Sequence, residues 1–420
     1  MRWAVWFWVG VVLLRMGYAW LAPQIDPFLR HDPLHGDAQV HDQMAWTLVQ
    51  EGRLQFVKGL QTAPAYIWLM AGVYGVVGHE PQAVRIVNAL LGVLALWGLW
   101  RVAVRWLGRR YAFVVVALAT IHPHLLMLSG WLYTENLMVP LVVWAIERAS
   151  ATRTVRNGVI VGVMLGLLAL TRANFLPFAG LVGLWWLFVT PASSGGASRF
   201  LSAGVLLAIT CLTVAPYILY LYGRYGHFIP IGLGGYTFLW ANNPEADGGF
   251  RADFTELRMV IDGQKVRVRD WLTAPNPVER DRKALRLALT WIRENPTDFL
   301  HLLWLKTRLS LSAFGLQEAG NRLLVRLLRF ADGLYWLYLL LAHWGLFVGW
   351  RSHWRQWGLV ALLEGWVWLT IWLYAGGSRP LLPIQPFWVL FFVHGVQRAL
   401  RRASTSAQQQ DVARLDDDID

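Results

Sequence analysis

The sequence predicts an all-α polytopic membrane protein, and three observations lead to this fold class. Of the 420 residues, 56% are hydrophobic and 15% are charged, whereas a soluble domain carries roughly a quarter charged residues. The mean hydropathy is +0.40, and the apolar residues stand in runs of about 20, the length of a bilayer-spanning helix. Each run is expected to be helical, because lipid offers the backbone no hydrogen-bond partners. Many of the 26 tryptophans lie near the ends of these runs, as in aromatic belts.

The net charge of +12 would indicate a nucleic-acid partner in a soluble protein. Here the arginines cluster in short loops between apolar runs, which is typical of membrane orientation, so no nucleic acid is expected as a partner. The single cysteine, Cys211, lies in an apolar run and excludes a disulfide framework. Residues 3–21 contain Arg15 and no small-residue cleavage site, so we interpret them as the first transmembrane helix and not as a signal peptide.

Hydropathy places about ten spans along the chain. They are residues 3–22, 84–100, 111–128, 131–147, 158–174, 176–190, 200–222, 331–350, 356–375 and 383–397. The short loops on one side hold Arg101, Arg105, Arg109, Arg110, Arg148, Arg153, Arg156, Arg199, Arg351, Arg355, Arg398, Arg401 and Arg402. The short loops on the other side hold only Arg172 and Arg379. Because cytoplasmic loops carry the excess of basic residues, both termini are expected in the cytoplasm and the protein in the inner or plasma membrane.

The spans divide the chain into four parts. Residues 1–222 form an N-terminal transmembrane module with a long outer loop at 23–83, and residues 223–330 form an outer-face loop with juxtamembrane helices. Residues 331–400 hold the C-terminal spans, and residues 401–420 are expected to be a disordered cytoplasmic tail. The apolar stretch 65–77 is too short to span and is interpreted as interfacial or re-entrant. The spacing of Val278, Leu285, Leu289 and Ile292 predicts an amphipathic surface helix, ended by Asn295 and Pro296.

The ionisable residues gather at the outer ends of the predicted spans. A substrate with a lipid tail and an anionic head suits such a place, since the tail can lie between helices while arginine grips phosphate. A carboxylate facing the acceptor could take the proton from an attacking hydroxyl, and a phosphate could leave without being protonated. The exception is Glu364, which lies in mid-span and must be paired or protonated. The outer set is Arg15, Asp37, Arg85, His122, His124, Glu135, Arg172 and Arg379.

An ordered series of short motifs runs through residues 1–400. It begins with Gly36-Asp37-Ala38 and Pro64-Ala65-Tyr66, and it continues with Arg85, Asn88, Thr134-Glu135, Leu170-Thr171-Arg172, Asn242-Asn243-Pro244, Asn295-Pro296, Lys306 and Arg379-Pro380. This series resembles the GT-C glycosyltransferases, most closely the branch of protein O-mannosyltransferases and aminoarabinose transferases. The resemblance implies a GT-C fold and an inverting transferase. The donor would be a sugar on polyprenyl phosphate, and the acceptor a glycolipid, polysaccharide or protein at the periplasmic or extracellular face.

The resemblance also implies roles for individual residues. Asp37 resembles the loop aspartate that acts as base, and Glu135 resembles the second acidic residue, which serves substrate or metal. Arg172 and Arg379 would face the carrier phosphate, with help from Arg85. The further residues expected to bind substrate are His41, Lys58, Tyr66, Asn242 and Asn243.

Several alternatives stay open at this stage. Asp37 could be a solvated loop residue, and Asp42 is a rival carboxylate that we interpret as a helix-surface charge. His122 and His124 could join Glu135 in a divalent metal site, although interfacial histidines without metal are the favoured reading. No cofactor is assigned beyond this metal. The chain departs from the family at Ala38, where relatives carry Glu, and at His41, where they carry Tyr.

Two other classes of protein fit the hydrophobic spans. A lipid or glycan transporter or flippase would need inverted repeats or helices broken in mid-span, and no convincing repeat is visible. A non-catalytic membrane assembly subunit would need none of the outer carboxylates.

Overall fold

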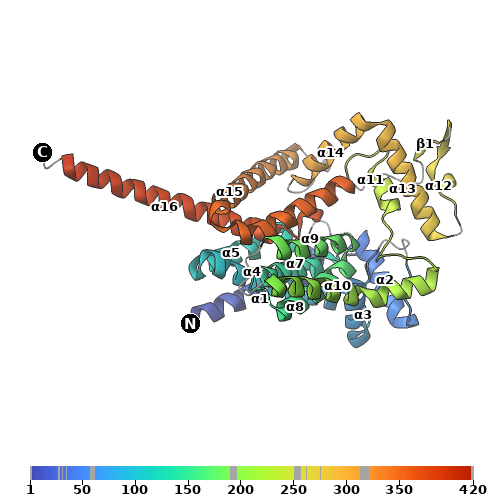
Figure 1. Cartoon of the computed structure of the whole chain (residues 1–420), viewed down its shortest axis with the longest axis horizontal. Helices are drawn as coiled ribbons and strands as arrows, with labels where there is room; N and C mark the ends of the chain where they lie inside the picture. The colour runs from blue at the N-terminus through green and yellow to red at the C-terminus, as the bar shows by residue number, and fades with distance from the viewer. Residues whose placement is uncertain are drawn as a thin grey trace.

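The computed structural model of the chain describes residues 2–26, 29–30, 32–34, 36–56, 62–189, 196–249, 257–261, 263–274, 276–312 and 322–417. These residues are almost entirely helical, as predicted, apart from one small antiparallel hairpin. Both termini lie toward one end of the molecule, and α2, α3, α12, α13 and β1 lie toward the other (Figure 1).

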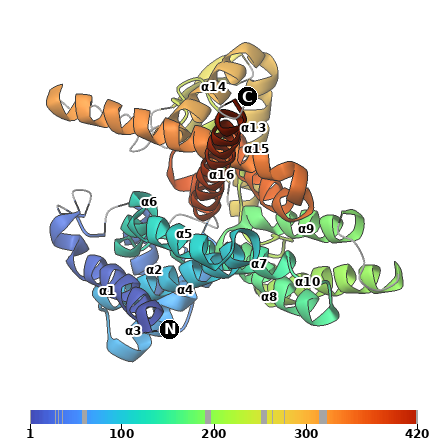
Figure 2. The same ribbon diagram turned by 90° about the vertical axis from the view of Figure 1, so that its left-hand side faces the viewer.

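Figure 2 separates the helices into two groups, which meet where α16 packs on α4 and α5 and where α15 packs on α9. The first group extends from α1 to α10, and the second contains α13 to α16. The first group consists of α1 (Arg2–Ile25), α2 (Asp37–Glu51), α3 (Ala65–Val77), α4 (Pro81–Leu107), α5 (Arg109–Ile121), α6 (Pro123–Met127), η1 (Leu128–Gly130), α7 (Glu135–Ala149), α8 (Val155–Thr171), η2 (Ala173–Phe175), α9 (Leu176–Phe188) and α10 (Gly196–Tyr225).

The remaining elements begin with a small unit that includes the hairpin. It contains α11 (Gly235–Ala241), β1 (Arg258–Ile261), β2 (Gln264–Arg267), α12 (Val268–Trp271), α13 (Pro277–Glu294) and α14 (Pro296–Ser310). They are followed by α15 (Arg322–Leu373), η3 (Arg379–Leu381) and α16 (Gln385–Asp417). The structure continues α16 to Asp417, where the sequence predicted a disordered tail. The alanine, glutamine and arginine residues of this stretch are good helix formers, and they extend a helix that is already nucleated.

Helix α15 folds back on itself. The Nε2 atom of His343 lies 2.8 Å from Oε1 of Glu364, and 21 residues of straight helix would hold these residues about 31 Å apart. Its two arms, Ala331–Trp350 and Trp354–Leu373, are each long and apolar enough to cross a bilayer. They confirm the two spans predicted in this region. Glu364, which also accepts a hydrogen bond from Trp388, is thus the paired mid-span carboxylate that the sequence required.

Every predicted span coincides with a helix, but the helices differ in length. Five of the described helices are long and apolar enough to cross a membrane, and α5 with the following turn would form a sixth, bent by 64°. By contrast, α7, α8 and α9 have 15, 17 and 13 residues. Two of them are short because polar positions, Thr134-Glu135 and Arg172, stand where a longer helix would continue. These breaks create the site described below.

The apolar face of α13 differs from the one predicted. The spacing indicated Val278, Leu285, Leu289 and Ile292, but Leu285 and Leu289 are exposed. The buried side chains are instead Val278, Ala284, Leu287, Ala288 and Trp291, and this face packs on α11. Alanine carries too little hydrophobicity to mark the buried stripe in a periodicity analysis.

Glycines allow α8 and α10 to approach closely. A Cβ atom at Gly162 would lie 2.6 Å from the backbone oxygen of Leu206, and one at Gly158 would lie 2.7 Å from that of Ser202. Small residues at such contacts are how helices pack tightly in lipid. The α8–α10 pair is therefore a rigid wall of the first group.

We expect Gly162→Ala to destabilise the protein, because the added methyl group meets backbone that cannot rotate away. The cost should be about 1–3 kcal/mol, seen as a lowered melting temperature in detergent. Gly204→Ala is the matched control, since a Cβ atom on this α10 glycine meets nothing within 4 Å. Equal melting temperatures for the two variants would contradict the close packing.

Candidate active site

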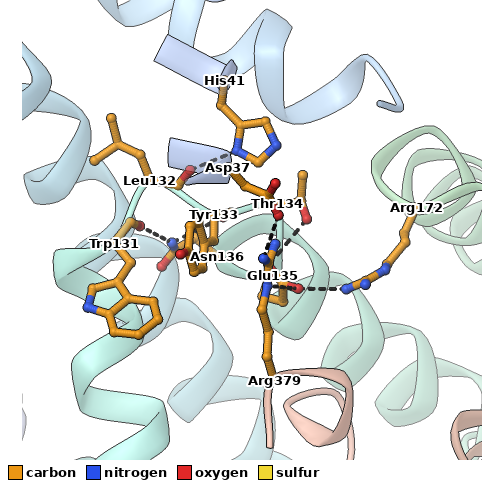
Figure 3. A network of polar contacts seen from close by, with 10 residues as sticks. All are labelled: Asp37, His41, Trp131, Leu132, Tyr133, Thr134, Glu135, Asn136, Arg172 and Arg379. Carbon is orange, nitrogen blue, oxygen red and sulfur yellow. Dashed lines mark hydrogen bonds and ion pairs between the residues drawn. The ribbon is translucent and has the colours of Figure 1, made fainter. Parts of the chain in front are cut away.

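Glu135 is the centre of a cluster of charged side chains. It is the first residue of α7 and has 0% of its side chain exposed. The guanidinium of Arg379 donates through Nε to Oε1 at 2.7 Å and through Nη2 to Oε2 at 3.0 Å. Arg172 donates to Oε1 at 2.6 Å, and the two arginines converge on the carboxylate from different sides (Figure 3). Such a fully buried carboxylate is stable only with close cationic partners.

Asp37 is the second carboxylate of the cluster. It begins α2, directly after Gly36, whose φ of 68° lets the chain turn into the helix. Arg379 donates through Nη1 to Oδ2 of Asp37 at 2.6 Å, so one guanidinium bridges both acids. Asp37 differs from Glu135 in exposure, because 46% of its side chain is accessible. It is therefore the carboxylate of the cluster that can meet a substrate.

Arg379 is held by an aromatic ring as well as by the two acids. Its guanidinium carbon lies 3.9 Å from the centroid of the Tyr133 ring, a cation–π contact. Burial alone would lower the pKa of Arg379, but Glu135 and Asp37 raise it above its ordinary value, so this residue stays charged. Tyr133 was missed from the sequence, although an aromatic residue two positions before a buried acid is a usable signal.

His41 and Tyr66 stand behind the cluster and support it. His41 donates through Nδ1 to the backbone oxygen of Leu132 at 2.8 Å, and its burial lowers its pKa, which keeps the ring neutral. Tyr66 is fully buried and hydrogen-bonds Asn88, which also binds the backbone of Trp131. These contacts fix the segment 131–134, which leads directly into Glu135. The structure thus gives both residues a supporting position, where the sequence predicted substrate contact.

Arg85, which the sequence predicted to help bind phosphate, contacts backbone oxygens in the structure. It is 4% exposed, and it donates to the backbone oxygens of Gly130 and Pro33, each at 2.9 Å. Its guanidinium thus satisfies the carbonyl of Gly130, at the helix break before α7, and that of Pro33, in the loop before α2. Lys58, predicted to bind substrate, lies outside the residues that the structure describes.

Asn242 and Asn243 also have structural roles, where the sequence predicted substrate binding. Asn242 donates to the backbone oxygen of Leu373 at 2.9 Å and accepts from Lys306 Nζ at 2.8 Å. Asn243 donates to the backbone oxygens of Leu239 and Trp240 and closes the turn after α11. Asparagine readily bonds to nearby backbone in this way.

Lys306 connects this region to Arg379. It is 0% exposed, and its ammonium binds Asn242 and the backbone oxygen of Trp372, with no carboxylate partner among the described residues. The next loop is tied down as well, since Gly376 donates to Gly248 and Gly377 to Ser310. These bonds fix the end of α15 and the loop that leads to Arg379.

Asp42 is not the surface charge that the sequence indicated. It is 6% exposed and accepts from the hydroxyl of Tyr74 at 2.5 Å, and its other oxygen lies 2.9 Å from Nε2 of His79. It therefore fastens α2 to α3 and to the following turn. The prediction failed because the partners lie 32 and 37 residues away in the chain.

The structure does not bring His122 and His124 to Glu135. His122 contacts the ring of Tyr338 at 5.7 Å between centroids, and His124 that of Tyr335 at 5.7 Å. Glu135 is engaged by arginines instead. In the described ranges no three His, Cys, Asp or Glu side chains are grouped so that they could hold a metal ion.

A cavity of about 400 Å³ opens beside Arg172, where the two helix groups meet. One wall comes from η2 and the start of α9, and the opposite wall comes from the end of α15. The 230–237 loop and the prolines after Arg379 complete it. Most of its lining side chains are apolar, and Arg172 is the one charged residue among the described residues that line it. The lining also includes Met138, Phe175, Leu233, Val367, Tyr374 and Pro383. An elongated apolar molecule with one anionic group would fit this cavity.

Comparison with known proteins identifies a related sequence family and similar folds. Residues 61–220 match the sequence model of the dolichyl-phosphate-mannose-protein mannosyltransferase family. Archaeoglobus fulgidus oligosaccharyltransferase, tethered to an acceptor peptide with the NVT sequon, has a TM-score of 0.55 at 12% identity, covering 96% of this chain and 50% of its own. That enzyme, AglB, with an inhibitory peptide and dolichol-phosphate, also gives 0.55, at 11% identity over 98% of this chain and 52% of its own.

A third solved structure is similar at a lower level. ArnT from Cupriavidus metallidurans bound to undecaprenyl phosphate has a TM-score of 0.47 at 14% identity, covering 97% of this chain and 80% of its own. No curated protein matches the sequence. The chain spans about half the length of the oligosaccharyltransferase. The protein is thus a multi-pass membrane protein of the GT-C fold, and the resemblance found in its motifs is confirmed.

The stability of the protein should depend on pH through Lys306. Burial lowers the pKa of this juxtamembrane lysine to about 7. Above that pH the folded protein has lost the proton that the unfolded chain keeps until about pH 10, so stability rises with pH. The melting temperature of wild type relative to Lys306→Met should therefore increase between about pH 6 and about pH 9. Parallel curves for the two proteins would show that Lys306 does not titrate in this range.

Proposed function

We propose that the protein is an inverting glycosyltransferase that moves a sugar from a polyprenyl-phosphate carrier to an acceptor at the outer membrane face. The observation that carries the proposal is the half-exposed Asp37, held by Arg379 next to an apolar cavity with a single cationic wall residue. An acid, a cation and an apolar cleft together match the three parts of such a reaction: acceptor, leaving phosphate and lipid tail.

The cavity is the proposed donor site. Its apolar walls would take the first isoprene units, and Arg172 would face the phosphate with the donors that it does not give to Glu135. Arginine suits this contact because its fork of N–H groups matches phosphate oxygens. The dolichol-phosphate of the oligosaccharyltransferase complex is a carrier of the same chemical class.

Asp37 is the proposed base. It would take the proton of the acceptor hydroxyl or amine as that atom attacks the anomeric carbon from the face opposite the phosphate. The bond from the anomeric carbon to the phosphate oxygen breaks, and its electron pair stays on the polyprenyl phosphate. This leaving group needs a nearby cation and no proton. The hydrogen bond from Arg379 fixes the position of this carboxylate.

Glu135 takes a different role in this scheme. Both of its oxygens accept hydrogen bonds from arginine, and its side chain is inaccessible. It would therefore position Arg172 and Arg379 without touching the reacting atoms.

We further propose that the end with α2 and α13 faces the periplasm or the outside. Arginines gather in the loops between α4 and α5 and between α7 and α8. These loops join the helix ends that were predicted to be cytoplasmic, and not the ends that carry the cluster. The excess of basic residues there indicates the cytoplasmic side. The acceptor would then be a glycolipid, a polysaccharide or a protein of the cell envelope.

Asp37→Asn should abolish transfer and leave the donor bound. Mass spectrometry of co-purified lipids should find polyprenyl phosphate, free or glycosylated, in wild type and an increased share of the sugar-loaded form in the variant. Glu51→Gln on the same helix is the control, because its exposed carboxylate binds Arg53 and Gln55 and, among the described residues, no member of the cluster. If mild extraction yields no polyprenyl lipid from either protein, the result would favour a transporter or an assembly subunit instead.

Arg172→Gln should weaken binding of undecaprenyl phosphate about tenfold or more, because a charge-assisted hydrogen bond is worth roughly 1.5–3 kcal/mol. Arg172→Lys should restore part of the affinity, since it restores the charge without the fork. Titration of the detergent-solubilised protein by native mass spectrometry measures this. Arg110→Gln, an exposed arginine on α5, is the control. Unchanged affinity in Arg172→Gln would show that the phosphate does not contact this residue.

A further inference from the structure

Helix α13 has a second apolar stripe on its outward side. Its inner face, with Leu287 and Trp291, is buried against α11. On the outer face Leu285 and Leu289 are 38% and 50% exposed, and residues four apart lie next to each other on a helix. An apolar partner would stabilise these two exposed leucines more than water does.

Arginines flank this stripe. Arg282 and Arg286 stand three positions before Leu285 and Leu289, and Arg293 stands four positions after Leu289. All three are exposed, and none makes an ion pair with a described residue. The carboxylate of Asp281 is engaged on the α11 side, where it accepts hydrogen bonds from the backbone N–H groups of Gly235 and Tyr236, and α13 also carries Glu279 and Glu294.

The position of α13 decides what could cover the stripe. Helix α10 is long and apolar enough to span the bilayer, and α13 runs across its direction at the end away from the termini (Figure 1). A helix so placed lies along the membrane plane. The next helix, α14, also exposes large apolar side chains, Leu300 at 65% and Trp304 at 59%. Leucine pairs with flanking arginines are typical of helices at the headgroup boundary.

We propose that the outer face of α13 binds acidic phospholipids, with Leu285 and Leu289 in the acyl boundary and Arg282, Arg286 and Arg293 on the headgroup phosphates. A soluble polyanion would use the arginines but would leave the leucines in water, so the lipid surface accounts for more of the observations. The inference does not depend on transfer activity. It concerns a surface separate from the Asp37–Glu135 cluster.

A fluorescence experiment on the full-length protein tests this surface. The only cysteine is replaced in Cys211→Ser, and Leu289→Cys then carries an environment-sensitive dye. The protein is reconstituted in phosphatidylcholine nanodiscs with or without about 30% phosphatidylglycerol. We expect a blue shift and strong quenching by spin-labelled lipid in the acidic discs. High salt should reduce both, since it screens the headgroup contact.

Arg282→Gln combined with Arg286→Gln should weaken the response to phosphatidylglycerol at least fivefold, while Arg109→Gln with Arg110→Gln, two exposed arginines of α5, should leave it unchanged. A dye at Leu285→Cys repeats the measurement if the first labelled protein is poorly folded.

Three outcomes would overturn the proposal. The dye could stay in water in every disc, or it could respond equally without acidic lipid. It could also respond only to a soluble polyanion such as heparin added to phosphatidylcholine discs, which would make the surface a polyanion site.

Discussion

The pairing of Glu135 with Arg172 and Arg379 is the interaction on which the rest of the site depends. A carboxylate with no exposed surface cannot stay ionised without cations, and these two arginines come from the end of α8 and from η3. Glu135 and Arg379 lie 244 positions apart in the chain, yet their contact joins the two helix groups. Because the same guanidinium holds Asp37, the position of the proposed base follows from a buried ion pair behind it.

Much of the surrounding polar structure serves that arrangement. Arg85 donates to the carbonyl of Gly130 and Asn88 to that of Trp131, where the helices are broken. Lys306 and Asn242 do the same at the end of α15. In lipid, an interrupted helix is tolerated only where side chains replace its lost hydrogen bonds. Arg85 and Asn242, which the sequence predicted to bind substrate, thus take part in closing the broken helices.

The division of labour between the two acids follows from burial. Asp37 and Glu135 share one cation, but of the two only Asp37 is accessible, so in the proposed reaction it would be the carboxylate that takes the acceptor's proton. The cavity beside Arg172 lies at the junction of the two helix groups, so both groups determine the shape of the cavity.

The sequence by itself determined the fold class, the helices and the four charged residues of the cluster. Hydropathy is a local property, because each spanning segment must satisfy its own backbone in lipid. Asp37, Glu135, Arg172 and Arg379 stood out because charges are rare at helix ends on the side poor in arginine. Only the tertiary structure decided which carboxylate is buried, that Arg85 and Asn242 bind backbone, and that α13 turns its alanines inward. These properties depend on partners tens to hundreds of residues away, and no local pattern records them.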